Sequence, residues 1–546
     1  MSPFLFRSLC SSIVLILASL FSTGCGRKES DVEKGIREGV LLIGNGAEPE
    51  DLDPHVVTGL PEYRILMGLF EGLTAYEPGT MAIVPGVAER WEISGDGRQY
   101  RFYLRENARW SDGQAVTAHD FEYAWRRVLS PKLGNRYTYL YDDIRNATAF
   151  HAGQVSWSEV GVRAETDRVL TVQLSQPAPY FLGLMTHNTF FPVSRVTIEA
   201  YGAMDQRGTA WTKPGNVVSN GPFALHAWRN ASHLELRPNP HYWDRSAVKL
   251  NAVRYLPIES VDTEERAFRN GQLHVTSTVP AHLIPTLRAR QAPELQLAPF
   301  LAIYYYELNV AKPPLNDPRV RRALSLALDR RALVERVTQG NETPAYSFIQ
   351  AGALDGQEGP VFTEDITEAR RLLAEAGFPE GKGFPSLEIL YNTQEAHRAI
   401  AEALQQMWQR NLGVQLRLTN QEWQVYLVNR RQQNFALARA GWVASYQDAT
   451  VFSNLLLSDS GNNHTGWKNQ EYDRVALAAR NALDPKKRIQ LFHQANAILN
   501  EEMPVIPLYF YTSKYLLHPS VKGWHQNLLN LHPIKAVSLS EPGSKP

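Results

Sequence analysis

The chain has 546 residues, a formal net charge of zero, 44% hydrophobic residues and 21% charged residues. Its length predicts roughly two to three domains, and its composition is typical of an ordinary globular protein. Because no large basic surface is implied, nucleic-acid binding gains no electrostatic support from the sequence.

Residues 1–25 have the pattern of an export signal, with a positive charge at Arg7 and an apolar run over residues 9–21. The run is too short, and its flanks are wrong, for a permanent membrane span. A small-residue site ends at Cys25, and we expect a lipoprotein-type signal in which Cys25 is lipidated. A secreted protein without a lipid is the alternative, since Ser22 stands where such signals usually carry Leu.

The two cysteines of the sequence exclude some kinds of site. Cys10 lies inside the predicted signal, so Cys25 would be the only cysteine of the mature chain. An intramolecular disulfide and a metal site built on cysteine are therefore not expected in the mature protein.

The first part of the mature chain alternates between tether, strand, loop and helix. We expect residues 26–38 to be a charged, poorly periodic tether between the anchor and the first domain, and residues 40–43 to be a buried strand. Residues 46–62 are rich in Pro, Gly and acidic residues, which predicts a loop. Apolar residues then recur at helical spacing over residues 63–73.

The pattern of predicted elements changes between Trp91 and Leu174. Gly95–Gly97 separates two short runs and predicts a hairpin. Thr117 is a suitable N-cap for a helix that reaches Leu129, and residues 168–177 alternate as a strand does. We interpret this block as a small inserted α+β domain.

The second half of the chain alternates helices and strands. Residues 216–258 are rich in strands, and a short helix follows over 261–270. From residue 301 the predicted strands are 301–309, 387–391, 414–418 and 505–511. The predicted helices start at Asp317–Pro318 and cover 364–376, 394–412, 423–431, 472–483 and 486–499. This alternation predicts an α/β lobe.

Motifs for catalysis are missing from the sequence. It contains no H-E-x-x-H, G-x-S-x-G, C-x-x-C or G-x-G-x-x-G pattern, and its histidines do not cluster at metal-ligand spacing. We therefore expect neither an enzyme nor a cofactor. An exported protein with two lobes and a polar, aromatic cleft favours ligand binding.

The segment Ala438–Thr450 combines a cation, Arg439, with Gly441 and the large aromatic Trp442. Glycine allows a backbone to approach a ligand closely, because it carries no Cβ. A buried strand with one salt-bridged arginine is the alternative interpretation of the same residues.

Twelve sequence blocks occur in an order that points to one protein family. They are LDPH (Leu52–His55), GLPE (Gly59–Glu62), LFEGL (Leu69–Leu73), PGVAERW (Pro85–Trp91), WSDG (Trp110–Gly113), AHDFEYAWRR (Ala118–Arg127), PGNVVSNGPF (Pro214–Phe223), YYYELN (Tyr304–Asn309), KPPLNDPRVRRALSLALDR (Lys312–Arg330), LYNTQEAHR (Leu390–Arg398), NQEW (Asn420–Trp423) and ARAGW (Ala438–Trp442). With these blocks the chain closely resembles the oligopeptide-binding proteins of bacterial ABC importers, solute-binding protein family 5.

The resemblance implies an α/β, two-lobed periplasmic-binding-protein fold of the cluster C type, with an additional small α+β domain inserted in the first lobe. The implied ranges are 39–70, 195–300 and 513–540 for the first lobe, 71–194 for the inserted domain and 301–512 for the second lobe. Such proteins capture extended oligopeptides through backbone pairing and lobe closure, and deliver them to the permease and ATPase subunits of the importer. A periplasmic monomer is implied.

The resemblance also implies the residues of the binding site. Gly441, Trp442 and Val443 correspond to the strand that pairs with the peptide backbone. The matches to pocket walls are Tyr304, Tyr305, Tyr306 and Trp423, and the matches to partners of the peptide carboxylate are Arg430, Arg439 and His397. Each has a structural alternative: core aromatics, a satisfied core histidine, or a solvated arginine pair at Arg430 and Arg431.

The chain departs from the family at the expected amino end of the peptide. The acid that pairs with the peptide's α-amino group falls at Ser445, and a second acid falls at Thr58, beside the candidate contacts Gly59 and Leu60. Asp448 and Glu48 are candidate substitutes. The ligand would be a peptide with a relocated anchor, or else a modified or N-blocked peptide such as a murein peptide; a ligand sensor or chaperone is a further alternative.

Two further departures concern stability and the second lobe. The cysteines of the family's disulfide fall at Ala302 and Val443, in agreement with the cysteine count. A lysine that the family carries before Gln339 has no clear counterpart, with Thr338 nearby.

Overall fold

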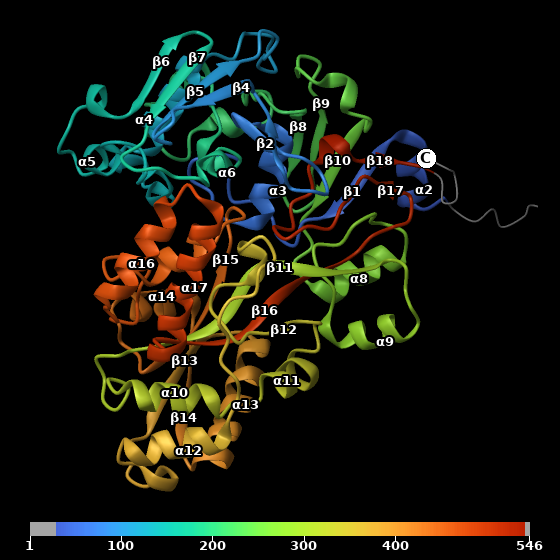
Figure 1. Cartoon of the computed structure of the whole chain (residues 1–546). Helices are drawn as coiled ribbons and strands as arrows, with labels where there is room; N and C mark the ends of the chain where they lie inside the picture. Colours follow the sequence, from blue (N-terminus) through green and yellow to red (C-terminus); the bar gives the residue numbers. More distant parts are fainter. Residues whose placement is uncertain (1–28, 541–546) are drawn as a thin grey trace, which may run out of the picture.

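The computed structural model describes residues 29–540 and contains three larger sheets (Figure 1). The first sheet has the order β1-β10-β9-β8 and carries the first lobe. Its strands are β1 (Val40–Gly44), β8 (Phe223–Arg229), β9 (His233–Pro238) and β10 (Ala252–Leu256). The helices around it are α2 (Asp31–Glu38), α3 (Leu60–Leu69), α7 (Arg195–Tyr201), α8 (Val261–Arg269) and α9 (Ile284–Ala289).

Residues 31–38 of the predicted tether form helix α2, a regular element that the poorly periodic sequence does not indicate. Ser30 and Glu33 form a reciprocal capping box at its start, and Gly39 ends it with φ 68°. The helix predicted over 63–73 forms earlier, as α3. It stops at Leu69 because Phe70 is extended, and the strand β2 (Thr74–Tyr76) soon follows.

The second sheet has the order β4-β5-β7-β6 and forms the inserted α+β domain. Its strands are β4 (Ala88–Ile93), β5 (Gln99–Leu104), β6 (Val162–Thr166) and β7 (Val169–Gln173), with α4 (Ala118–Val128), α5 (Ala147–His151) and α6 (Phe181–Leu184) around them. The predicted hairpin is β4–β5. The predicted cap is also confirmed, since the Asp120 carboxylate accepts hydrogen bonds from the backbone N–H and hydroxyl of Thr117. A short ribbon, β2 with β3 (Ile83–Pro85), precedes this sheet.

The third sheet forms the second lobe and has the order β12-β16-β11-β15-β13-β14. Its strands are β11 (Leu295–Leu308), β12 (Thr343–Pro344), β13 (Leu387–Asn392), β14 (Leu416–Gln421), β15 (Leu437–Val443) and β16 (Val505–Leu516). The helices are α10 (Pro318–Leu326), α11 (Arg330–Ala332), α12 (Ile366–Glu375), α13 (Glu395–Leu412), α14 (Trp423–Arg431), α15 (Thr450–Ser453), α16 (Gln470–Asn481) and α17 (Pro485–Glu502). The predicted alternation of helix and strand is confirmed.

Two long strands connect the first and second lobes. β11 and β16 pair in antiparallel register over residues 295–299 and 303–307 of β11, with register shifts between Pro299 and Ile303 and between Tyr304 and Tyr305. Figure 1 shows both strands running from the region of α8 and α9 into the second lobe. A last small ribbon, β17 (Val521–Lys522) with β18 (Ser538–Leu539), follows β16. Within residues 29–540, no helix is long and apolar enough to cross a membrane.

Candidate ligand-binding cleft

One edge of β15 is open over most of its length. β15 pairs with β11 from Leu437 to Val443, but with β13 only through Leu437 and Ala438. Because the Ala444 N–H bonds to β11, antiparallel alternation turns the backbone groups of Gly441 and Val443 toward the open edge. Among the described residues these groups have no backbone partner, and another extended chain would satisfy them.

Arg439 lies at the start of this open edge and has no acidic partner within the described residues. Its guanidinium lies over the Tyr304 ring, 4.8 Å from the centroid. Nη1 and Nη2 reach the Asn392 Oδ1 and the Tyr511 hydroxyl, each at 3.4 Å, and Nε is buried without a partner. A mostly buried cation held only by neutral groups is a receptor for an anion.

His397 stands next to this cation. Its Nδ1 is 3.2 Å from the Tyr304 hydroxyl. Burial, followed by the charge of Arg439, lowers the pKa of His397 to about 3, so the imidazole is neutral at pH 7. The end of the cleft at Arg439 therefore carries one positive charge supported by neutral hydrogen-bonding groups.

Arg430, the other predicted carboxylate partner, is already paired. Its Nε and Nη2 donate to the two carboxylate oxygens of Glu307 at 2.6 and 2.7 Å, and Glu307 is buried. Burial opposes the charge of Arg430, but Glu307 outweighs it and holds the pKa above its ordinary value. Arg430 thus differs from Arg439 in having its charge neutralised within the protein.

The predicted aromatic walls lie behind the cleft surface in this conformation. Tyr304, Tyr305 and Tyr306 are all fully buried. Tyr304 and Tyr306 pack into the core of the second lobe, whereas Tyr305 points to the opposite face, against Phe348. Trp423 is exposed and stacks on Tyr426 at the start of α14. Tyr304 supports the site by carrying Arg439 and His397.

A cavity of about 200 Å³ lies at the other end of the open edge. The predicted residues Thr58, Gly59 and Leu60 line it from the first lobe, and Val443 and Ser445 line it from the second. The structure therefore brings together five predicted residues from segments almost 400 positions apart. No carboxylate lines this cavity among the described residues.

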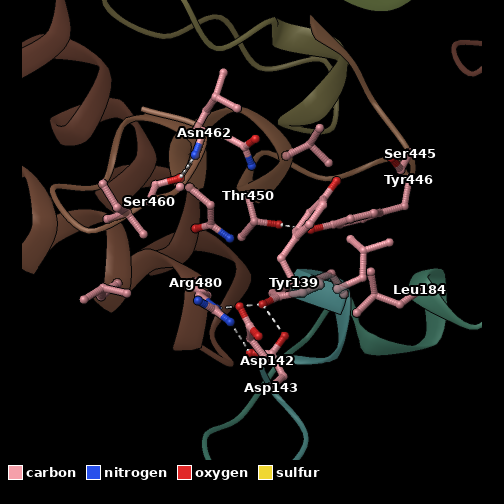
Figure 2. A pocket seen from close by; sticks show the side chains of 18 of the residues that line it. Tyr139, Asp142, Asp143, Leu184, Ser445, Tyr446, Thr450, Ser460, Asn462 and Arg480 are labelled. Atoms are coloured by element: carbon pink, nitrogen blue, oxygen red, sulfur yellow. Dashed lines mark hydrogen bonds and ion pairs between the residues drawn. The ribbon is translucent and has the colours of Figure 1, made fainter. Parts of the chain in front are cut away.

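A second and larger cavity of about 490 Å³ adjoins the first at Ser445, which lines both. Figure 2 shows that its walls come from the inserted domain and from the second lobe. Asp142 and Asp143 face Arg480 of α16 across it (Figure 2). Sequence reasoning missed these residues, and no motif around them gives a signal; the fold alone brings them to Ser445.

A known protein family matches most of this chain. The bacterial extracellular solute-binding proteins, family 5 (middle region), match residues 82–464. The chain belongs to this family. Within residues 29–540, no cluster of His, Cys, Asp and Glu side chains is arranged to hold a metal ion.

Relatives in family 5 align over nearly the whole chain. The periplasmic oligopeptide-binding protein OppA of Salmonella typhimurium is 38% identical, covering 91% of this chain and 92% of its own length. The periplasmic murein peptide-binding protein MppA of Escherichia coli is 36% identical, covering 88% and 89%. The crystal structure of Haemophilus influenzae OppA in complex with RPPGFSPFR is 33% identical, with a TM-score of 0.78, covering 92% and 99%.

The two acids that the sequence offers as substitutes at the amino end have other partners in this family 5 chain. Asp448 forms a bidentate pair with Arg488 at 2.7 and 2.8 Å and caps the backbone at Thr450. Glu48 accepts hydrogen bonds from the Trp228 indole and the Ala231 N–H. Neither acid lines the cavities at Ser445.

Ala302 and Val443 are direct partners in the pairing of β11 with β15. Since Ala444 bonds to Leu301, the adjacent pair of Ala302 and Val443 is a non-hydrogen-bonded pair, in which Cα atoms lie about 4.5 Å apart. This geometry would accept a disulfide. The two positions therefore form one pair in the fold. This agrees with the expectation that both cysteines of the family's disulfide are replaced here.

Proposed function

We propose that the protein is the extracytoplasmic solute-binding component of an ABC importer for oligopeptides. The observation that carries this proposal is Arg439, a mostly buried cation without an acidic partner at one end of an open strand edge. An extended peptide that pairs with Gly441 and Val443 would bring its carboxylate to Arg439.

The arrangement favours recognition of a backbone over recognition of a sequence. Main-chain hydrogen bonds to a strand edge are available to every peptide, and they give affinity that is independent of side chains. A charge-assisted bond to the terminal carboxylate then sets the register. His397 is neutral and would donate or accept a hydrogen bond beside that carboxylate without adding charge.

Lobe closure is part of the proposal. We propose that the first lobe comprises 39–70, 195–300 and 513–540, the inserted domain 71–194 and the second lobe 301–512. The boundaries at 300/301 and 512/513 fall inside β11 and β16, beside the register shift of their pairing. Bending there would close the lobes on the ligand, since a few residues at such a position absorb a hinge motion.

We also propose the partners of the protein and its cellular location. The mature protein would be a periplasmic monomer that passes peptides to the permease and ATPase subunits, without catalysis of its own. Cys25, which lies outside the described residues, would carry a lipid on a bacterial membrane. Mass measurement of the mature amino-terminal peptide tests this, and an unmodified Cys25 would contradict it.

Ser445 and Thr58 favour a second candidate ligand, a modified or N-blocked peptide. The cavity of about 200 Å³ offers no carboxylate to an α-ammonium group, and a buried ammonium without a partner costs several kcal/mol. The similarity to a murein peptide-binding protein also supports this candidate. Both candidates share the proposed pairing with β15.

Two experiments test these proposals. Native mass spectrometry of protein purified without refolding would show retained oligopeptides, and retention of a non-peptide ligand alone would contradict the main proposal. Calorimetric titration of one peptide with and without N-acetylation should give similar affinities. A large loss on acetylation would show that a free amino terminus is required after all.

A further inference from the structure

Ser445 lies where the two cavities of the cleft meet. It lines the cavity of about 200 Å³ beside Val443 and the cavity of about 490 Å³ beside Trp442. The side chain at this junction is short. A ligand chain that follows the β15 edge past Val443 therefore reaches the larger cavity directly.

The larger cavity has an excess of negative charge. Asp143 is neutralised, because its carboxylate accepts hydrogen bonds from Arg480 at 2.6 Å and from the Tyr180 hydroxyl at 2.7 Å. Among the described residues, the Asp142 carboxylate accepts a hydrogen bond from the Thr148 hydroxyl alone. Asp459 has no hydrogen bond or ion pair in the described part of the chain. Burial raises the pKa of Asp142, and the charge of Arg480 acts against this rise. Within the described residues, Asp142 and Asp459 thus line the cavity without an ion pair of their own, and Arg480 is shared between Asp143 and Asp142.

Other groups on the cavity wall also require a hydrogen-bond donor or suit a cation. The Asn454 Oδ1 is buried and accepts no hydrogen bond within the described residues. The rings of Tyr139, Tyr446 and Trp442 line the same space, and Figure 2 shows Tyr139 and Tyr446 beside Ser445. Aromatic faces next to carboxylates form a favourable environment for an ammonium or guanidinium group.

We infer that this cavity binds a basic side chain at the amino-terminal end of the peptide ligand. The inference rests on the proposed peptide-binding function and specifies the ligand class. The lysine or arginine side chain would lie near Asp142 and Asp459, beyond Ser445.

The cavity has the size and the charge for this role and disfavours an acidic side chain. About 490 Å³ lies within the range of roughly 300–1,000 Å³ that is usual for ligand pockets. Its only arginine, Arg480, is committed to Asp143. A charge-assisted hydrogen bond to one of the free carboxylates corresponds to about tenfold to hundredfold in affinity.

N-acetylated peptides isolate the effect of the side chain. Ac-Lys-(Ala)n and Ac-Nle-(Ala)n, in a series of lengths, would be titrated into the full-length mature protein by calorimetry. At the best length, the lysine peptide should bind about tenfold or more tighter than the norleucine peptide. The preference should shrink at high salt, since it depends on charge.

The double variant Asp142→Asn/Asp459→Asn should bind both peptides equally, with the affinity of the norleucine peptide unchanged. The double variant Asp355→Asn/Glu358→Gln, at two exposed sites outside both cavities, is the charge-matched control and should keep the preference. Equal binding of the two peptides by the native protein, or a preference that survives in the double variant, would overturn the inference. If neither acetylated peptide binds at any length although Lys-(Ala)n with a free amino terminus does, the inference is overturned and the proposed function stands. If no peptide binds in either form, the proposed function itself fails.

Discussion

The two ends of the open β15 edge differ in how they hold charge. At the carboxylate end, Arg439 is a preformed cation on a support of Tyr304, His397 and Asn392. At the amino end, Ser445 carries no charge and opens into two cavities. The Arg439 end therefore offers a fixed charge to a ligand, whereas the Ser445 end offers open cavity volume.

The two ends would contribute differently to specificity along one strand. A desolvated arginine without an acid costs folding free energy, which a ligand carboxylate recovers when it binds. Every unmodified peptide carries that carboxylate, so the cost serves all ligands. Discrimination between peptides would then depend on the amino end, where the side chains of the cavity walls can differ without disturbing β15.

The largest expected effect comes from the paired arginine near the carboxylate end. Arg430→Gln would leave Glu307 buried and unpaired, and the free energy of unfolding should fall by about 3–5 kcal/mol. Urea unfolding followed by far-UV circular dichroism measures this. Arg430 would then contribute to stability, whereas Arg439 stays available to a ligand.

The control is the double variant Glu307→Gln/Arg430→Gln, which removes both charges together. It should recover most of the lost stability and bind peptides nearly as the native protein does. Full stability in Arg430→Gln alone would show that Glu307 does not depend on this pair.

The second effect is a gain in stability from a disulfide between the strands. Ala302→Cys/Val443→Cys should form a disulfide on oxidation and raise the free energy of unfolding by about 2–4 kcal/mol. Unfolding with and without reductant measures the gain, and Val443→Cys alone is the control. We expect the peptide affinity to be unchanged, because β11 and β15 already pair at Ala302 and Val443 without the disulfide. A large change in affinity would show that this part of β15 moves when the peptide binds.

The third effect is a pH dependence of the free energy of unfolding that arises from His397. Its pKa is about 3 in the folded protein and near 6.5 when unfolded, so the unfolded chain binds more protons between these values. The stabilisation that comes from keeping His397 neutral is fully present in the free energy of unfolding above pH 6.5, and it decreases as the pH falls toward 3. Stability of His397→Gln should therefore fall less steeply below pH 6.5 than that of the native protein. Parallel curves would contradict a neutral His397.

Local patterns made most of the elements predictable. Thr117 and Asp317 stand where caps belong, and both cap helices in the structure. The helix at 31–38 was also predictable, because Ser30, Glu33 and Gly39 carry its start and stop signals. By its charged composition alone, the same short segment is typical of a tether.

The candidate site was predictable only in part. The open strand with Arg439 and Gly441 follows from a continuous block of sequence and its family resemblance. The pairing of Arg430 with Glu307 joins residues 123 positions apart, and no local pattern indicates it. Asp142 and Asp459 likewise meet Ser445 only because the inserted domain packs against the second lobe.

The central claim is that Arg439 binds the carboxylate of an extended peptide. The most direct measurement is a calorimetric cycle with one peptide as free acid and as carboxyl-terminal amide, on the native protein and on Arg439→Gln. Amidation should weaken native binding by about tenfold to hundredfold, as for a lost charge-assisted hydrogen bond. In Arg439→Gln the acid and the amide should bind equally. Equal affinities of the acid and the amide for the native protein would contradict the claim.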